Sequence, residues 1–321
     1  MNTAPAPLPE RLLFGAHPRA TLARAGVSDR ELRGPLWTGV NRGLWAWLPG
    51  DPPAIEQRIR QVVPLVRPGG AIGGWAAAWL HGAGWLDGEG FTGEPRPVLL
   101  CLPPAVHCER RRGVQVFRSV LEPHEIGRVA GIPVTAPLRT SVDLVRLTRP
   151  WQEAVVAADS LRAAGLLDLL SAGHWLDRHA GSRGVPQARQ VLALSREGVK
   201  SPQESRLRLV WTLEAGLPDP LVNRHIWHRE GNLLGEADLV EPESGLVAEF
   251  DGRHHADAAQ RGVDNARRDA MRLAGLTVVV VTAPGLTTWR RRTVHELRSA
   301  WAAAVARDAA GDAWFIRRPG V

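Results

Sequence analysis

Residues 234–251, LGEADLVEPESGLVAEFD, decide the fold of the last third of the chain. Two runs in this stretch suit β-strands, Leu234–Val240 and Leu246–Phe250. The segment between them contains proline, serine and glycine, which favour a turn. We therefore expect two neighbouring strands that carry Asp238 on one strand and Glu249 on the next.

The elements expected on either side of these strands make an α/β domain. In chain order they are helix Pro202–Ala215, strand Leu221–His228, the two strands above, helix Asp257–Ala274, strand Thr277–Thr282 and helix Thr288–Ala309. The apolar run Val278–Val281 lies between Gly275 and Pro284, and such a run is typical of a buried strand. We expect an α/β sheet with helices on both faces.

Three carboxylates are expected to converge on the strand pair. Asp251 lies two residues after Glu249 and therefore on the same face of its strand, and Asp238 comes from the neighbouring strand. Crowded carboxylates are unfavourable without a cation, and Mg²⁺ binds such oxygen clusters, with Mn²⁺ as an alternative. A cation there polarises a phosphodiester and activates water. Alternatively, these are ordinary hairpin charges paired with arginines, although charges inside an apolar strand favour a functional site.

The helix that begins near Ser201 has two interpretations. The stretch Ser201-Pro-Gln-Glu204 is typical of a capping box, in which Ser201 caps the helix and Glu204 reaches back to the cap. Glu204 is equally expected to add a carboxylate to the site, from a helix packed beside the strands. The sequence leaves both alternatives open.

After the strand pair come four residues that are candidates for binding nucleic acid: Arg253, Gln260, Arg267 and Arg268. Arginine binds phosphate oxygens through paired hydrogen bonds, so these side chains are expected near a scissile or neighbouring phosphate. The alternative for Arg267 is a salt bridge to Asp264, three residues earlier on the same helix.

Length and composition limit the class of protein. A chain of 321 residues is expected to form two or three domains. Its formal net charge of +7 favours a polyanionic partner such as nucleic acid, and Lys200 is the only lysine among its 40 lysines and arginines. Two cysteines, no signal-peptide pattern and no membrane-spanning run predict a soluble, cytoplasmic protein. The sequence has no Walker A loop, no Gly-x-Ser-x-Gly motif and no His-Glu-x-x-His motif, which excludes P-loop NTPases, most serine hydrolases and zincins.

Residues 1–50 are predicted to form a winged helix-turn-helix. The expected elements are the helical stretches Ala20–Ala25 and Ser28–Arg33 and the short aromatic strand Leu44–Leu48. Ser28 is expected to cap the second helix, which leaves Arg30 and Arg33 facing solvent as candidate DNA contacts. The alternative is a solvated helix pair packed on the next domain.

Residues 51–196 are predicted to form an α+β region without visible chemistry. Helices are expected at Ala54–Val66, Gly74–His81 and Trp151–Ala164, and strands near Pro97–Leu102 and Gly113–Arg118. Trp75, Trp79 and Trp85 are expected in the core, since they fall on apolar helix faces. This region is the expected surface for a protein partner, and the sequence assigns no oligomeric state.

An ordered set of short motifs follows the last third of the chain. The set is Ser201-Pro-x-Glu204, Gly235-Glu-Ala-Asp238, Val247-Ala-Glu-Phe-Asp-Gly-Arg-His-His255, Gln260, Asp264-x-x-Arg267, Met271 and Gly275-Leu-x-Val278. It resembles the Vsr-like endonuclease domain of actinobacterial proteins, a branch of the PD-(D/E)XK superfamily. The resemblance implies a restriction-endonuclease-like fold for residues 197–321 and Mg²⁺-dependent cleavage of DNA.

The resemblance also implies roles for particular residues. Asp238 and Glu249 are implied as metal ligands, and the backbone carbonyl of Phe250 is a further candidate ligand. His255 corresponds to the histidine of the family's Asp-Gly-x-x-His motif and is the candidate for proton transfer, because the pKa of histidine lies near neutral pH. Asp251 stands where many members of the superfamily keep a lysine, so a histidine or an arginine would have to replace that lysine.

The front of the chain resembles antitoxins of the AbiEi type. The motifs concerned are Arg42-Gly-Leu-Trp45, Trp75-Ala-Ala-Ala-Trp79-Leu-His-Gly82 and Pro137-Leu-Arg-Thr-Ser-Val-Asp-Leu144. This resemblance implies a transcriptional-regulator module that binds DNA.

Together, these expectations predict a metal-dependent endonuclease that hydrolyses phosphodiester bonds in duplex DNA and is positioned by an N-terminal DNA-binding module. One alternative is a DNA-binding regulator or type IV antitoxin-like protein whose nuclease fold has lost activity, which the missing lysine favours. A second alternative is a nuclease directed at RNA, or a partner that neutralises a toxin.

Overall fold

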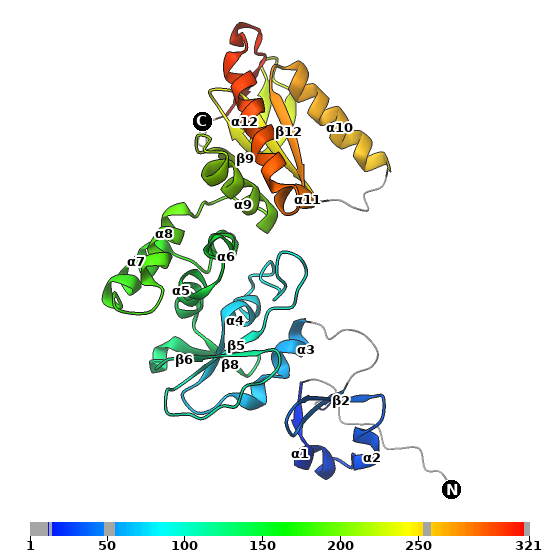
Figure 1. Ribbon diagram of the computed structural model, residues 1–321, viewed down its shortest axis with the longest axis vertical. Helices are drawn as coiled ribbons and strands as arrows, with labels where there is room; N and C mark the ends of the chain where they lie inside the picture. The colour runs from blue at the N-terminus through cyan, green and yellow to red at the C-terminus, as the bar shows by residue number, and fades with distance from the viewer. Residues whose placement is uncertain (1–11, 13–14, 48–54, 253–257, 318–321) are drawn as a thin grey trace. The chain divides into compact units, whose positions relative to one another are not determined.

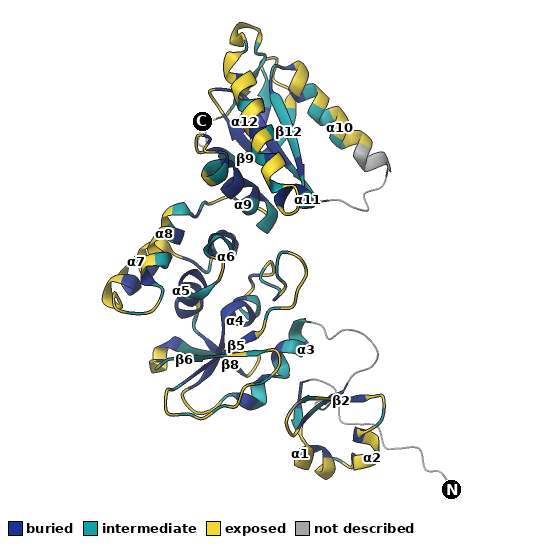
Figure 2. Ribbon diagram, viewed as in Figure 1, coloured by how far each residue is buried: buried dark blue, intermediate teal, exposed yellow. Residues whose placement is uncertain are grey.

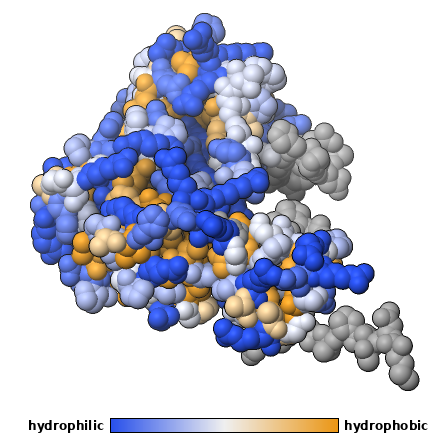
Figure 3. Space-filling view, turned by 60° about the horizontal axis from the view of Figure 1, so that its bottom comes forward, coloured by the Kyte–Doolittle hydropathy of each residue, from blue (hydrophilic) through white to orange (hydrophobic). Residues whose placement is uncertain are grey.

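The chain is a mixed α/β protein with two compact units. The computed structural model describes residue 12 and residues 15–47, 55–252 and 258–317, and within these ranges it has three β-sheets. The N-terminal unit comprises Met1–Leu147 and Ala164–Arg189, and the C-terminal unit comprises Thr148–Ala163 and Gln190–Val321. Hydrophilic residues cover most of the face drawn in Figure 3. Among the described residues, every helix is too short or too polar to span a lipid bilayer.

The N-terminal unit begins with two short helices and a small antiparallel sheet (Figure 1). The elements are β1 (His17–Pro18), α1 (Arg19–Arg24), α2 (Asp29–Leu32), β2 (Trp37–Asn41) and β3 (Leu44–Trp47), with sheet order β1-β3-β2. The predicted cap is confirmed, because the Ser28 hydroxyl accepts the N–H of Glu31, whose carboxylate in turn accepts the N–H of Ser28. Arg30 and Arg33 are exposed, as expected. Strand β2 was not predicted, because glycine interrupts its apolar pattern.

The rest of the N-terminal unit is built on a five-stranded sheet of order β6-β5-β4-β8-β7. Its elements are α3 (Ile55–Arg60), β4 (Ala71–Gly73), α4 (Gly74–Leu80), β5 (Val98–Leu102), β6 (Val114–Arg118), β7 (Ile126–Val129), β8 (Ile132–Thr135), α5 (Pro137–Leu147), α7 (Leu169–Arg178) and α8 (Val185–Leu194), the last of which continues into the C-terminal unit. The predicted helices at α3 and α4 and the predicted strands at β5 and β6 are confirmed.

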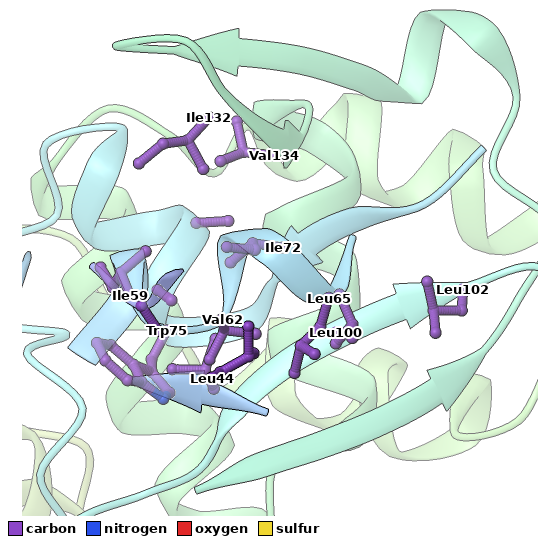
Figure 4. Close-up of a cluster of buried hydrophobic side chains, with 14 of the residues drawn as sticks. Leu44, Ile59, Val62, Leu65, Ile72, Trp75, Leu100, Leu102, Ile132 and Val134 are labelled. Atoms are coloured by element: carbon purple, nitrogen blue, oxygen red, sulfur yellow. The ribbon is translucent and has the colours of Figure 1, made fainter. Parts of the chain in front are cut away.

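The core of this unit gathers side chains from the central strands and from α4 (Figure 4). Ile72, Leu100 and Val134 are fully buried there, and Trp75 packs among them. Trp79 is half-buried against the same core. The prediction for Trp85 is wrong, because its side chain is 57% exposed. Helix α4 ends before Trp85, with His81 as its C-cap, so that tryptophan has no helix face to share.

A buried network of charged side chains joins three segments of the N-terminal unit. Arg139 donates to Asp143 at 3.0 Å and to Glu125 at 2.8 Å. Arg146 donates to the same Asp143 at 2.8 Å, and the indole N–H of Trp175 donates to Glu125. All five residues are buried, so each charge depends on the others for its compensation.

We expect Asp143→Ala to destabilise the N-terminal unit by about 3–5 kcal/mol, because two buried guanidinium groups lose their shared carboxylate. Urea unfolding followed by circular dichroism measures this loss. The control is Asp177→Ala, which removes an exposed carboxylate paired with Arg189 and should cost about 1 kcal/mol or less. Equal, small losses in both variants would contradict the expectation.

The C-terminal unit contains the site elements. They are α6 (Trp151–Ala163), α9 (Pro202–Leu209), the π-helical turn η4 (Val210–Glu214), β9 (Leu221–His228), β10 (Leu233–Glu241), β11 (Leu246–Asp251), α10 (Ala258–Leu273), β12 (Thr277–Thr282), α11 (Ala283–Leu286), α12 (Arg290–Ala306) and β13 (Trp314–Ile316). The sheet order is β12-β11-β10-β9-β13, and β11 and β12 run parallel. The predicted order of helices and strands is confirmed, except that β13 and α11 were not predicted.

Helices lie on both faces of this sheet, as predicted. Helix α10 covers one face, α9 and α12 cover the other, and both α10 and α12 expose their outer sides (Figures 1 and 2). The expectation for the run Val278–Val281 is wrong in one respect, because β12 is an edge strand and its first three valines are only half-buried. An apolar run indicates cover by helices, but it does not indicate a strand neighbour on each side.

Helix α9 is anchored on α6 by buried charges. Arg208 donates to Asp159 at 2.8 Å, and the Ser205 hydroxyl donates to the same carboxylate at 2.7 Å. Arg206 donates twice to Glu153 on α6, at 2.8 and 2.7 Å. These bonds fix the helix whose N-terminus approaches strands β9 and β10.

Candidate functional site

The strand pair β10–β11 opens at Asp238. The antiparallel ladder pairs Leu239 with Ala248 and ends there. Beyond it, the N–H of Phe250 donates at 2.7 Å to the side-chain carboxylate of Asp238. A side chain therefore replaces a backbone carbonyl as the acceptor, and Asp238 is brought next to the segment that carries Glu249, as the sequence predicted.

Glu249 is a deeply buried carboxylate on β11. It is 2% exposed, and its Oε2 accepts hydrogen bonds from Arg267 at 3.0 Å and from Arg268 at 2.8 Å. Its Oε1 is buried and has no hydrogen-bond partner among the described residues. Buried polar atoms are nearly always satisfied, so this carboxylate oxygen is suited to a hydrogen-bond donor or a cation.

The electrostatics of Asp238 also favour positive charge at this place. Burial raises the pKa of its carboxyl from the ordinary 3.8 to about 6, against the opposing effect of the Phe250 N–H. The neighbouring carboxylates of Glu204 and Glu249 raise this pKa further, and Arg267 lowers it. Three acidic residues from three elements therefore act on one another here, and their mutual repulsion is relieved by added positive charge.

Glu204 takes part in the cap of α9 and also acts on Asp238. Its Oε1 accepts the Ser201 hydroxyl at 2.8 Å, and its Oε2 accepts the N–H of Lys200 at 2.9 Å and the Asn223 amide at 2.6 Å. Ser201 caps the helix as predicted, but the Glu204 carboxylate reaches the N–H of Lys200 and not that of Ser201, so the predicted capping box is incomplete. The charge of Glu204 raises the pKa of Asp238, and its role as a carboxylate of the site stays a prediction.

Two residues of this site were missed by the sequence analysis. Asn223 has a left-handed backbone (φ +48°), rare for a residue inside a strand, and its amide also donates to the Gly198 carbonyl at 2.9 Å. Lys200 forms an ion pair with Glu236, two residues before Asp238 on β10. The loop before α9 thus brings the single lysine of the chain to β10, a pairing that the sequence did not predict. The expectation that a histidine or an arginine replaces the superfamily lysine stays a prediction.

The third predicted carboxylate, Asp251, is partly exposed. It forms an ion pair at 3.6 Å with Arg268, which also bonds Glu249. Across the residues that the structure describes, no group of three or more His, Cys, Asp or Glu side chains is arranged to hold a metal ion. The predicted convergence of three strand carboxylates is thus reduced to the pair Asp238 and Glu249.

The other predicted site residues are distributed as follows. Arg267 and Arg268 lie on α10 and turn toward Glu249. Gln260 lies on the same helix, and its side chain is outside the described part. Arg253 and His255 fall in 253–257, outside the described residues, so their predicted roles stay predictions. Arg30 and Arg33 belong to the N-terminal unit.

The donors at Asp238 and Glu249 fit a hard divalent cation. Mg²⁺ is commonly held by one or two carboxylates, keeps several waters and takes further oxygens from a substrate phosphate. The buried Oε1 of Glu249, which has no partner among the described residues, and the raised pKa of Asp238 both favour a positively charged ligand. The Phe250 backbone adjoins this pair through its bond to Asp238, so its carbonyl remains the candidate third oxygen.

Comparison of the chain with protein-family models, with curated proteins and with solved structures found no match. The interpretation of the site therefore depends on its own geometry and charges.

We expect Asp238→Asn to raise the melting temperature of the metal-free protein by a few degrees at about pH 7. Folding raises the pKa of Asp238, so between about pH 4 and about pH 6 the folded chain keeps a proton that the unfolded chain has lost. The free energy of unfolding of the wild type therefore falls as the pH rises through this range. The gain should vanish below about pH 4, where Asp238 is protonated in both states.

Differential scanning calorimetry across this pH range measures the effect. The control is Asp269→Asn, an exposed carboxylate on α10 whose ion pair with Arg272 contributes little. A melting temperature that falls in Asp238→Asn at about pH 7 would show that the ionised carboxylate stabilises the fold.

Proposed function

We propose that the C-terminal unit is a metal-dependent, restriction-endonuclease-like nuclease domain that hydrolyses phosphodiester bonds in DNA. The observation that carries the proposal is the buried Glu249, whose Oε1 has no partner among the described residues, beside Asp238. Further support comes from the predicted order of helices and strands and from the net charge of +7, which suits a polyanionic substrate.

The roles follow from the contacts. Asp238, Glu249 and the Phe250 carbonyl would hold Mg²⁺, which when bound supplies charge to the phosphodiester and acidity to water. Arg267 and Arg268 neutralise Glu249 in the chain described here. With a cation held at Glu249, the guanidinium groups of Arg267 and Arg268 would be available to bind phosphate oxygens in pairs.

Other residues have supporting roles. Glu204 positions charge near Asp238 and is itself held by Asn223. His255 is assigned proton transfer, from the sequence motif. The N-terminal helices, with exposed Arg30 and Arg33, are assigned DNA binding that brings the nuclease domain to its substrate.

We expect purified protein to nick supercoiled plasmid with Mg²⁺ or Mn²⁺ and to lose this activity with chelator. Glu249→Gln keeps the volume of the side chain but removes its charge, and should lower the nicking rate by roughly 100-fold or more. Gel electrophoresis of timed samples measures the rate. The control is Glu243→Gln in the exposed turn between β10 and β11, which should nick like the wild type.

A second candidate function is a DNA-binding regulator or antitoxin-like protein without nuclease activity. The observation in its favour is the pairing of Glu249 with two arginines, which already balances its charge. Plasmid that stays intact with both metals, yet shifts on a gel, would establish this candidate and overturn the nuclease. Cleavage of RNA but not of DNA would change the substrate assignment.

A further inference from the structure

Three apolar side chains lie side by side on an exposed part of the C-terminal sheet. Trp227 on β9 is directly opposite Leu233 on β10 and directly opposite Phe315 on β13. Residues opposite one another across neighbouring strands share a face, so these three residues form one continuous patch, the sheet-edge platform. Leu233 is 50% exposed, Phe315 is 37% exposed and Trp227 is half-buried.

The platform carries positive charge. The guanidinium of Arg317 lies 3.8 Å from the centre of a Trp227 ring, which is close for a cation–π contact. His225, two residues before Trp227 and therefore on the same face, is exposed, as is Arg229 after the end of β9. Glu230 is the nearby exposed acid and lies 3.5 Å from His228. An anionic partner is therefore favoured.

The platform shares strands β9 and β10 with the candidate nuclease site. His225 is opposite Glu236, which pairs with Lys200 and lies two residues before Asp238 in β10. The platform lies on the face of the sheet opposite to Ile226, which packs with Met271 of α10, whereas Glu249 is bonded by Arg267 and Arg268 of that helix.

We infer that the sheet-edge platform binds unpaired bases of a nucleic-acid strand. The inference rests on the proposed nuclease function and specifies its substrate as one with a single-stranded segment. An indole, a phenyl ring and a guanidinium plane stack on the faces of bases, and these faces are accessible in unpaired nucleotides but hidden in a duplex. The positive charge suits the phosphates of the same strand.

The test measures binding rather than cleavage. In the Glu249→Gln background with Mg²⁺, fluorescence anisotropy compares a labelled oligothymidylate of about 20 nucleotides with a blunt duplex of equal length. Trp227→Ala, Phe315→Ala and Arg317→Ala should each weaken binding to the single strand about tenfold, the loss of roughly one stacked base, and change duplex binding less than about twofold. Circular dichroism and thermal melting confirm that each variant is folded.

The matched control is Trp289→Ala, which removes a 56% exposed tryptophan from the start of α12, away from the platform strands. It should bind both probes like the parent protein. Arg317→Ala and Phe315→Ala remove exposed side chains and keep the test valid if Trp227→Ala does not fold.

Unchanged affinity for the single strand in folded platform variants would overturn the inference. Analytical ultracentrifugation of the same variants tests whether the platform instead contacts a second copy of the chain. A loss of self-association with unchanged binding of the single strand would give that result. Binding that depends on the platform, in a protein that nicks no substrate, would overturn the nuclease proposal and leave the platform in place.

Discussion

The hydrogen bond from the Phe250 N–H to the Asp238 carboxylate is the constraint on which the candidate site depends. It replaces the next backbone bond of the β10–β11 ladder, which ends at Leu239 and Ala248. A carboxylate is thereby held where two strands separate, in a partly buried place that disfavours its charge. Glu249 is buried within reach of α10, and among the described residues only one of its two oxygens accepts a hydrogen bond.

Two sets of buried charges in this chain behave differently. In the N-terminal unit, Glu125 and Asp143 are bonded by arginines, so the buried charges compensate one another. In the C-terminal unit, Glu249 is equally buried but retains an oxygen without a partner among the described residues, and Asp238 has a raised pKa.

The site also depends on a segment distant in sequence. Helix α9, which carries Glu204, is anchored through Arg208 and Ser205 to Asp159 on α6. Helix α6 comes from Thr148–Ala163, between two segments of the N-terminal unit. A fragment that begins at residue 197 would lack this helix and expose the buried pair, so the nuclease domain proposed here needs α6 for its own stability.

The sequence by itself determined what depends on local pattern and local bonding. Strands β9 and β12 lie at the predicted residues, and the caps at Ser28 and Ser201 follow from side chains within three residues of the helix start. The closeness of Asp238 and Glu249 was also predictable, because a short turn joins their strands. Each of these features involves residues near one another in the chain.

Only the tertiary structure decided which distant side chains meet. The ion pair of Lys200 with Glu236, the effect of Glu204 on Asp238 and the edge position of β12 all depend on how separate segments pack. Hydrophobic periodicity shows that a residue is covered, but not by which element, because burial of apolar area is not directional. Hydrogen bonds and ion pairs are directional, and they form only after packing has brought their partners together.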